Sequence, residues 1–168
     1  MCTVNLCRRL NLPLIARSLD NTQYNPEKYN PVIVRINNPK STALIFSSGK
    51  VVCTGTRSKE EALKATRRFA RLIYINVDCL IKFCNFRILN LVCSGSIGKS
   101  RVNLRDIYLN FEQCTYEPDL FPGMKIPILP LKNCNVVALL FHTGKIVITG
   151  AKYKKDVDFA FKYILDKL

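Results

Sequence analysis

Several patterns that would define other classes of protein are missing from this 168-residue sequence. It contains no run of about 18 apolar residues and no signal-peptide pattern, so it predicts neither a membrane span nor secretion. No stretch rich in proline, glycine and serine divides it. A content of 48% hydrophobic and 23% charged residues is typical of a folded domain rather than of a disordered chain.

Acidic residues are scarce. Only 12 Asp and Glu stand against 26 Lys and Arg, which gives a net charge of +14 at pH 7. Such an excess favours a polyanionic partner, nucleic acid above all, although a solvated basic surface would have the same composition.

Side chains for catalysis or metal binding are also few. His142 is the only histidine, and no carboxylate cluster occurs in both halves of the chain, whereas an enzyme needs a general acid or base, a nucleophile or a metal. None of the eight cysteines forms the C-x-x-C spacing of zinc and redox sites. We therefore expect no enzymatic activity, no cofactor, no metal site, and free thiols in a reducing compartment.

The sequence does contain an internal repeat. ALIFSSGKVVCTG at 43–55 returns as ALLFHTGKIVITG at 138–150, with eight of the 13 positions identical. YNPEKY at 24–29 returns as YEPDLF at 116–121. A period near 90 residues indicates an internal duplication with pseudo-twofold symmetry rather than a solenoid.

The repeat predicts one domain over residues 1–168, made of a first pseudo-repeat at 1–78 and a second at 79–168. In the first, short β-rich runs at 32–36, 43–46 and 51–55 are separated by turn sequences. We expect a strand meander, followed in each repeat by a helix.

The helix of the first repeat is expected over 59–75, because Ser58 and Glu61 form a capping box. Its apolar face is predicted to consist of Ala62, Leu63, Thr66, Phe69, Ala70 and Ile73. A cationic stripe on the other face consists of Lys64, Arg67, Arg68 and Arg71. The matching apolar face of the C-terminal helix consists of Val157, Phe161, Ile164, Leu165 and Leu168. The unit is thus α+β.

The strands are apolar on both faces, which helices on one side do not explain. If Ala43, Ile45, Val51 and Cys53 face the helices, then the residues between them face the other way. A partner subunit could cover that second face, or it could be an exposed apolar surface that binds a ligand. The pattern alone does not assign the faces, because a one-residue register shift exchanges them.

Four segments, ALIFSSGKVVCTGTRSKEEA, YEPDLFPG, ALLFHTGKIVITGAK and FRILNLVCSG, resemble the TATA-box-binding protein family, and the resemblance covers nearly the whole chain. It implies an α+β fold in which two pseudo-symmetric repeats form a curved ten-stranded antiparallel sheet, or saddle, with helices on the convex face. The concave face would bind the minor groove of double-stranded TATA-box DNA.

The resemblance also assigns residues to the DNA. The wedges that kink DNA would be Tyr29, Phe46, Phe121 and Phe141; this family is itself a standard example of such wedging. Tyrosine at 29 is a departure, and its hydroxyl would need a partner, so the kink at that end is expected to be weaker. Minor-groove contacts would come from Asn90, Val92, Leu44, Val52, Thr54, Leu139, Val147, Thr149 and Pro122. Apolar and short polar groups suit this groove, because they reject the guanine amino group.

Phosphate contacts are expected from Arg35, Ser48, Lys50, Thr143 and Lys145, which flank that face. The resemblance further implies protein partners. The stripe Lys64, Arg67, Arg68 and Arg71 would contact transcription factor IIA or repressors, although a solvated helix face is the alternative. Glu117 and Asp119 would contact factor IIB. TBP-associated factors, a nuclear location, and a monomer on DNA that can self-associate when free complete the implied picture.

The function implied is that of a general transcription initiation factor that nucleates preinitiation complex assembly. The alternative is a related paralogue with reduced TATA specificity that acts mainly through protein partners. A third hypothesis is a protein that binds RNA on the face of its sheet, but such a protein would need exposed aromatic residues at the centre of the sheet. Two alignments remain open. The first central asparagine of the family either precedes Met1 or is replaced by Asn5, and the longer segment 124–135 leaves the second-half counterpart of Arg35 unassigned.

Overall fold

The computed structural model of the protein describes residues 1–98, 100–131 and 135–168. Its elements are β1 (Cys2–Asn5), α1 (Leu12–Ser18), β2 (Thr22–Asn25), β3 (Tyr29–Asn37), β4 (Lys40–Ile45), β5 (Lys50–Thr54), α2 (Lys59–Asn76), β6 (Cys84–Ile88), β7 (Leu91–Ser96), α3 (Leu104–Ile107), η1 (Tyr108–Asn110), β8 (Gly123–Pro127), β9 (Val137–Phe141), β10 (Lys145–Ala151) and α4 (Lys154–Leu165). They form two compact units, Met1–Leu89 and Asn90–Leu168.

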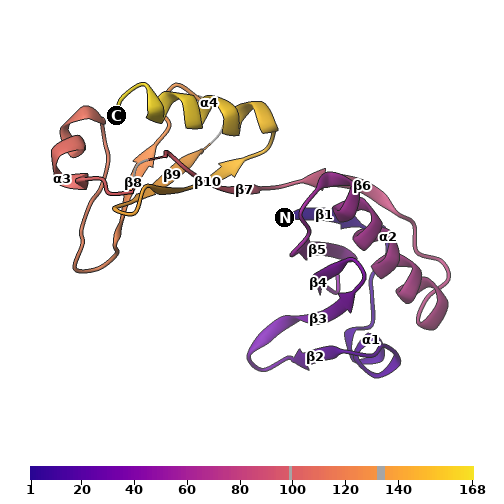
Figure 1. Ribbon diagram of the computed structural model, residues 1–168. Helices are drawn as coiled ribbons and strands as arrows, with labels where there is room; N and C mark the ends of the chain where they lie inside the picture. The colour runs from indigo at the N-terminus through magenta and orange to yellow at the C-terminus, as the bar shows by residue number, and fades with distance from the viewer. Residues whose placement is uncertain (99, 132–134) are drawn as a thin grey trace. The chain divides into compact units, whose positions relative to one another are not determined.

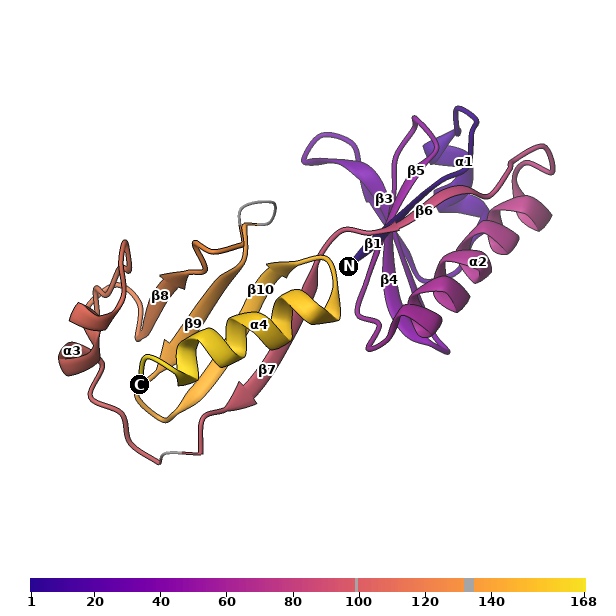
Figure 2. The ribbon, with the colours of Figure 1, turned by 90° about the horizontal axis from the view of Figure 1, so that it is seen from above.

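The first unit is an antiparallel sheet of six strands in the order β2-β3-β4-β5-β1-β6. Figure 2 shows α1 and α2 on the same side of this sheet. Between the sheet and the helices lies a core that includes Ala43, Ile45, Val51 and Cys53, all buried. This settles which alternate residues of β4 and β5 face the helices.

The second unit is an antiparallel sheet of four strands in the order β7-β10-β9-β8. Helix α4 runs along it, as Figures 1 and 2 both show. Ala138, Leu140, Ile146 and Ile148 are buried in its core, and they are the repeat counterparts of the buried residues in β4 and β5. The two halves of the duplicated sequence therefore build equivalent layers.

The predicted α+β class is confirmed, and the described residues form ten antiparallel strands. The helix predicted over 59–75 is Lys59–Asn76, and its N-terminus is capped by the Ser58 side chain, which accepts a hydrogen bond from the Glu61 N–H at 3.1 Å. The Glu61 carboxylate in turn accepts from the backbone N–H of Arg57 at 2.9 Å. The capping box therefore satisfies two N–H groups at this end of the helix.

Two details of the predicted helix faces are wrong. Leu63 is only half-buried, and Ala65 is buried in its place. Leu165 is exposed, whereas Ala160 is fully buried. In both helices the core side selects positions three and four residues apart, and a small alanine sits where the helix approaches the sheet.

In the sequence, the boundary between the two units lies between Leu89 and Asn90, later than the repeat boundary expected at 78/79. The reason is strand pairing, because β6 lies beside β1 and completes the sheet of the first unit. The boundaries of the two pseudo-repeats in the ancestral duplication stay a prediction.

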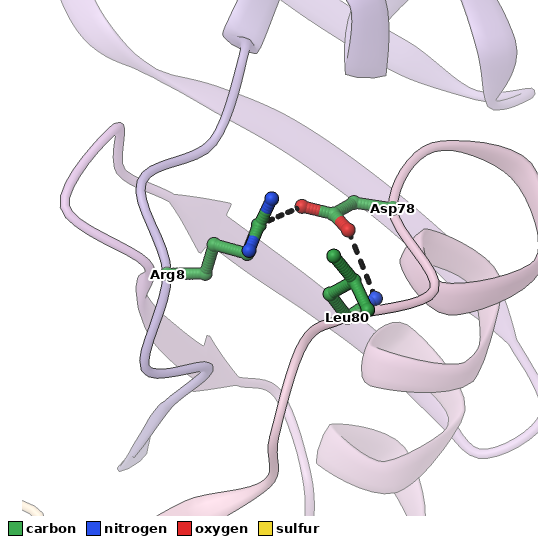
Figure 3. Close-up of polar contacts among 3 residues, drawn as sticks. All are labelled: Arg8, Asp78 and Leu80. Carbon is green, nitrogen blue, oxygen red and sulfur yellow. Dashed lines mark hydrogen bonds and ion pairs between the residues drawn. The ribbon is translucent and has the colours of Figure 1, made fainter.

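The loop after β1 is held against two neighbouring loops. Figure 3 shows the ion pair between the Arg8 guanidinium and the Asp78 carboxylate, which also accepts the Leu80 N–H at 2.9 Å. A Cβ added at Gly49, whose φ is +84°, would lie 2.3 Å from the Arg8 carbonyl oxygen. Glycine is therefore required in the β4–β5 turn by both conformation and space.

The seven cysteines in the described ranges are all free, and Cys134 lies outside them. Cys2 and Cys53 are buried partners on adjacent strands β1 and β5. The hydrogen bond between their thiols lowers the pKa of Cys2 and raises the pKa of Cys53. Both act as core residues of the first unit.

Replacing Cys7 with glycine is expected to stabilise the protein by roughly 1 kcal/mol or less. Cys7 has a φ of +56°, a left-handed conformation that costs an L-residue about 1–2 kcal/mol and that glycine adopts freely. The gain in stability is smaller than this cost, because glycine loses more conformational entropy on folding. Thermal unfolding would measure the gain. Cys7→Ala removes the thiol but keeps the strain, so equal stabilisation by both variants would contradict this explanation.

Candidate nucleic-acid interface

The sheet of the first unit leaves one face without helices. Leu44 and Val52 lie opposite each other on β4 and β5, between the buried positions, and Phe46 and Thr54 continue the same alternation. All four are half-buried or exposed, although three are apolar or aromatic. This is the set that the family resemblance assigns to DNA; the contact itself stays a prediction.

The second unit has the same uncovered face. Leu139 and Val147 are opposite each other on β9 and β10, and Phe141 and Thr149 lie on the same side. A hollow of about 520 Å³ is lined there by Phe141, Thr143, Lys145 and Val147, together with Ser94, Gly95, Ser96 and Ile146. The structure thus brings four predicted contact residues from the β9–β10 hairpin to one place.

Two of the predicted wedges form a ring pair. The centroids of Phe121 and Phe141 are 5.9 Å apart at an interplanar angle of 62°, an edge-to-face arrangement that aromatic rings favour. Gly123 lies against both rings, since a Cβ there would come within 2.7 Å of Phe121 and 2.9 Å of Phe141. Phe121 nevertheless remains 44% exposed.

The first unit has the corresponding aromatics without that pairing. Tyr29 is 49% exposed and Phe46 is half-buried, and no ring contact joins them in the part of the chain described. Pro31 occupies the place of Gly123. Gly123 lies opposite Phe141, and Pro31 directly precedes Val32, which lies opposite Ile45, the residue before Phe46. Among the described residues, the predicted wedge Tyr29 therefore lacks the ring contact that Phe121 makes with Phe141.

Asn90 is tied to the end of β10. Its side-chain amide donates to Thr149 Oγ1 at 3.2 Å, and its carbonyl oxygen accepts the Gly150 N–H at 2.8 Å. These two bonds set the orientation of the amide beside Thr149. Val92, two residues further on, is 63% exposed, so it is accessible for the groove contact predicted for it.

Asn5 does not replace a second central asparagine. It lies opposite Lys50 on β5, whereas Ser96 lies opposite Lys145 on β10. Since Lys50 and Lys145 are repeat counterparts, Asn5 corresponds to Ser96 and not to Asn90. The Asn5 side chain accepts the Cys7 N–H at 2.8 Å instead.

The predicted phosphate contacts are exposed on the strands and turns around the uncovered faces. They are Arg35, Ser48, Lys50, Thr143 and Lys145. Arg35 also donates to the Gln23 amide oxygen at 3.4 Å. Pro122 is exposed between Phe121 and Gly123. No acidic side chain lies within ion-pairing distance of these cations in the residues described.

The predicted partner-binding residues lie elsewhere. Lys64, Arg67, Arg68 and Arg71 are exposed on α2 and line a groove of about 530 Å³ with Leu72 and Ile75. Arg68 is engaged within the protein, because it donates to the Asn38 carbonyl oxygen at 2.7 Å. Glu117 and Asp119 are exposed before β8. Binding of partners to these groups stays a prediction.

Three further side chains on the uncovered faces were not singled out from the sequence. Thr3 lies opposite both Val52 and Arg87, and Lys125 lies opposite Leu139. Arg87 and Lys125 add positive charge on the side of the predicted DNA contacts. Only strand pairing reveals them, because their own segments carry no repeat signal that fixes the face.

Among the described residues no group of three or more His, Cys, Asp or Glu side chains could hold a metal ion. Nor is any helix there long and apolar enough to cross a membrane.

A family model described as "Transcription factor TFIID (or TATA-binding protein, TBP)" matches residues 1–75 and 85–168. The chain belongs to the TATA-binding protein family. It is 44% identical over 163 residues to the TATA-box-binding protein of Caenorhabditis elegans, which covers 96% of this chain and 46% of that relative. It is 43% identical over 161 residues to TATA box-binding protein-like 2 of Rattus norvegicus, covering 95% of this chain and 45% of that relative.

Among solved structures, the Methanococcus jannaschii TATA-binding protein matches with a TM-score of 0.83 and 36% identity, covering 99% of this chain and 93% of that one. The fold predicted from the resemblance is thus confirmed. The chain spans about half the length of the two named relatives, 46% and 45%. Segment 76–84, which contains Asp78 and Leu80 of Figure 3, lies outside the matched family regions.

Proposed function

We propose that this protein binds the minor groove of TATA-containing duplex DNA and bends it, as a general initiation factor that acts in the nucleus. One observation carries the proposal. Each unit leaves an apolar sheet face uncovered, and the same residue types recur there at duplicated positions in a chain of net charge +14. Membership of the TATA-binding protein family supports it.

The uncovered faces suit an A·T-rich minor groove. Valine, leucine and threonine side chains can lie against the flat edges of A·T pairs, whereas the amino group of guanine would meet an apolar surface that cannot accept its hydrogen bond. Thr54 and Thr149 offer short hydroxyl groups to the base acceptors. The aromatic pair Phe121–Phe141 would enter a base step and unstack it, a mode of binding for which this family is itself a standard example.

Protein partners complete the proposed role. The cations of α2 face away from the sheet, so a partner could bind them while the uncovered face holds DNA. Factor IIA or a repressor on α2, factor IIB on Glu117 and Asp119, and TBP-associated factors would then assemble around a monomer on DNA. This role requires no chemistry on the nucleic acid, and the proposal assigns no enzymatic activity.

The test is a titration of a TATA duplex that carries donor and acceptor dyes at its ends, against a duplex with G·C pairs at the centre. We expect TATA-selective binding with a shortened end-to-end distance of the duplex. The preference for the TATA duplex should persist as the salt concentration rises. Equal binding to both duplexes without bending, with affinity falling steeply with salt, would mean that charge alone holds the DNA. That result would favour the paralogue that acts mainly through protein partners.

A further inference from the structure

We propose that each unit has a phosphate-binding hollow at one edge of its uncovered face, and that the cation in it comes from a different strand position in each unit. Arg35 supplies it in the first unit and Lys125 in the second. This inference rests on the proposed binding of duplex DNA and assigns one phosphate contact that the sequence did not reveal.

The hollow of the first unit lies at the edge formed by β2 and β3. It has a volume of about 440 Å³ and is lined by Asn21, Thr22, Gln23, Arg35 and Asn37. Arg35 donates to the Gln23 amide oxygen at 3.4 Å, so two of the lining side chains are linked. Amides, a hydroxyl and one cation are the donors that phosphate oxygens accept from.

The hollow of the second unit lies at the corresponding edge, along β8. Its volume is also about 440 Å³, and its lining includes Gln113, Thr115, Lys125 and Pro127. Thr115 and Lys125 exchange two backbone hydrogen bonds of 2.9 Å, so the segment at Thr115 is held beside β8 by an isolated bridge. The polar groups of this lining are two amides, those of Gln113 and Asn135, a hydroxyl and one cation. The rest of it is apolar and consists of Pro127, Ile128, Leu129, Leu131, Val136 and Val137.

The strand register shows that the two hollows share equivalent positions at this edge of the sheet. Gln23 lies opposite Ile33, as Thr115 lies opposite Lys125. The residues two positions before Gln23 and Thr115 also share a left-handed backbone, with φ of 53° at Asn21 and 55° at Gln113. The same turn of the duplicated chain therefore contributes to both hollows.

The cation occupies a different strand position in each unit. Arg35 lies opposite Thr42 and Pro127 lies opposite Val137. Thr42 and Val137 each precede by one residue the alanine that begins the shared ALIF and ALLF segments, so Pro127 is the counterpart of Arg35. The second unit thus has no cation at that position, and Lys125 stands two residues away on the same face, roughly 6.6 Å along the strand.

Lysine in place of arginine changes how the site can bind a phosphate group. An arginine can bind a phosphate through two parallel hydrogen bonds, whereas a lysine acts as a flexible point charge. None of the described lining residues of either hollow is acidic, so each has a net positive charge. Lys125 is also nearer to Gly123 and the Phe121–Phe141 pair, so the phosphate it holds should lie beside the base step that this pair enters.

The first experiment measures the salt dependence of binding to the TATA duplex for wild type, Lys125→Gln and Arg35→Gln. Each lost phosphate contact should reduce the slope of log K against log salt by about 0.9, and the double variant should lose about twice as much. Lys162→Gln is the matched control, because Lys162 is exposed on α4, over the covered face, and its slope should equal that of wild type.

The second experiment places single uncharged methylphosphonates along the duplex. One position should weaken binding by wild type and leave Lys125→Gln unaffected. Lys125→Ile combined with Pro127→Arg rebuilds the arrangement of the first unit, and it should restore the slope with sensitivity at a neighbouring phosphate. Unchanged circular dichroism would show that each variant is folded.

The results separate the two proposals. If wild type binds and bends the TATA duplex but Lys125→Gln keeps the wild-type slope and methylphosphonate profile, the hollow is not a phosphate site and the DNA-binding proposal stands. If wild type binds no duplex, both proposals fall. A reduced slope together with the loss of one methylphosphonate effect establishes the Lys125 contact.

Discussion

Replacing Phe121 with alanine is expected to lengthen the end-to-end distance of a bound TATA duplex and to weaken binding roughly 10- to 100-fold, which is about 1.4–2.8 kcal/mol. The reason is the exposed ring, held edge-to-face against Phe141 at 5.9 Å. A ring that unstacks a base step keeps the duplex bent, and alanine cannot fill the opened step. The same dye-labelled titration that tests function measures both changes.

Two controls make this result specific. Phe159 on α4 is 43% exposed and stacks on Tyr163, so Phe159→Ala removes an equally exposed ring from the covered side and should leave bending unchanged. Phe121→Tyr copies the residue that the first repeat has at Tyr29, and it should bend DNA less than wild type but more than the alanine variant. Full bending by Phe121→Ala would show that this ring is not a wedge.

Much of the site could be predicted because the sequence contains an internal repeat, so each pattern occurs in both halves. The alternation of ALIF and VVCT leaves two assignments of faces, and the family resemblance chose the one in which Leu44 and Val52 lie on the uncovered side. Burial of Ala43, Ile45, Val51 and Cys53 agrees with that choice. Helix α2 was predictable to within one residue, since the Ser58 cap and the apolar spacing are both local signals.

What could not be predicted depends on register between distant strands. Asn5 was a plausible second central asparagine by residue type, but its pairing with Lys50 makes it the counterpart of Ser96. Likewise, no local pattern shows that Pro127 occupies the position of Arg35, because the segment after β8 differs in length between the repeats. Pairing partners are set by the folded sheet, and a sequence specifies them only through contacts that are far apart in the chain.

Replacing Phe69 with alanine is expected to give the largest loss of stability, about 3–5 kcal/mol. Phe69 is 1% exposed and packs within the same core cluster as Ile45, Val51 and Ile73, so its removal leaves a cavity between α2 and the sheet. Thermal unfolding should show a fall in Tm of roughly 6–20 °C. A change in Tm of less than about 2 °C would mean that the core collapses onto the vacated space.

The duplication provides the control for this cavity. The Ser58 and Tyr153 caps align the two long helices, so Phe69 corresponds to Ile164, which is 0% exposed in the core of the second unit. Phe69→Ile therefore tests a side chain that the same fold already accepts, and it should cost only about 1–2 kcal/mol because most of the volume is kept. Below their unfolding temperatures both variants should bind the TATA duplex as wild type does, because Phe69 faces the helices' side of the sheet. Weaker binding by folded Phe69→Ile would show instead that packing beneath the sheet controls the uncovered face.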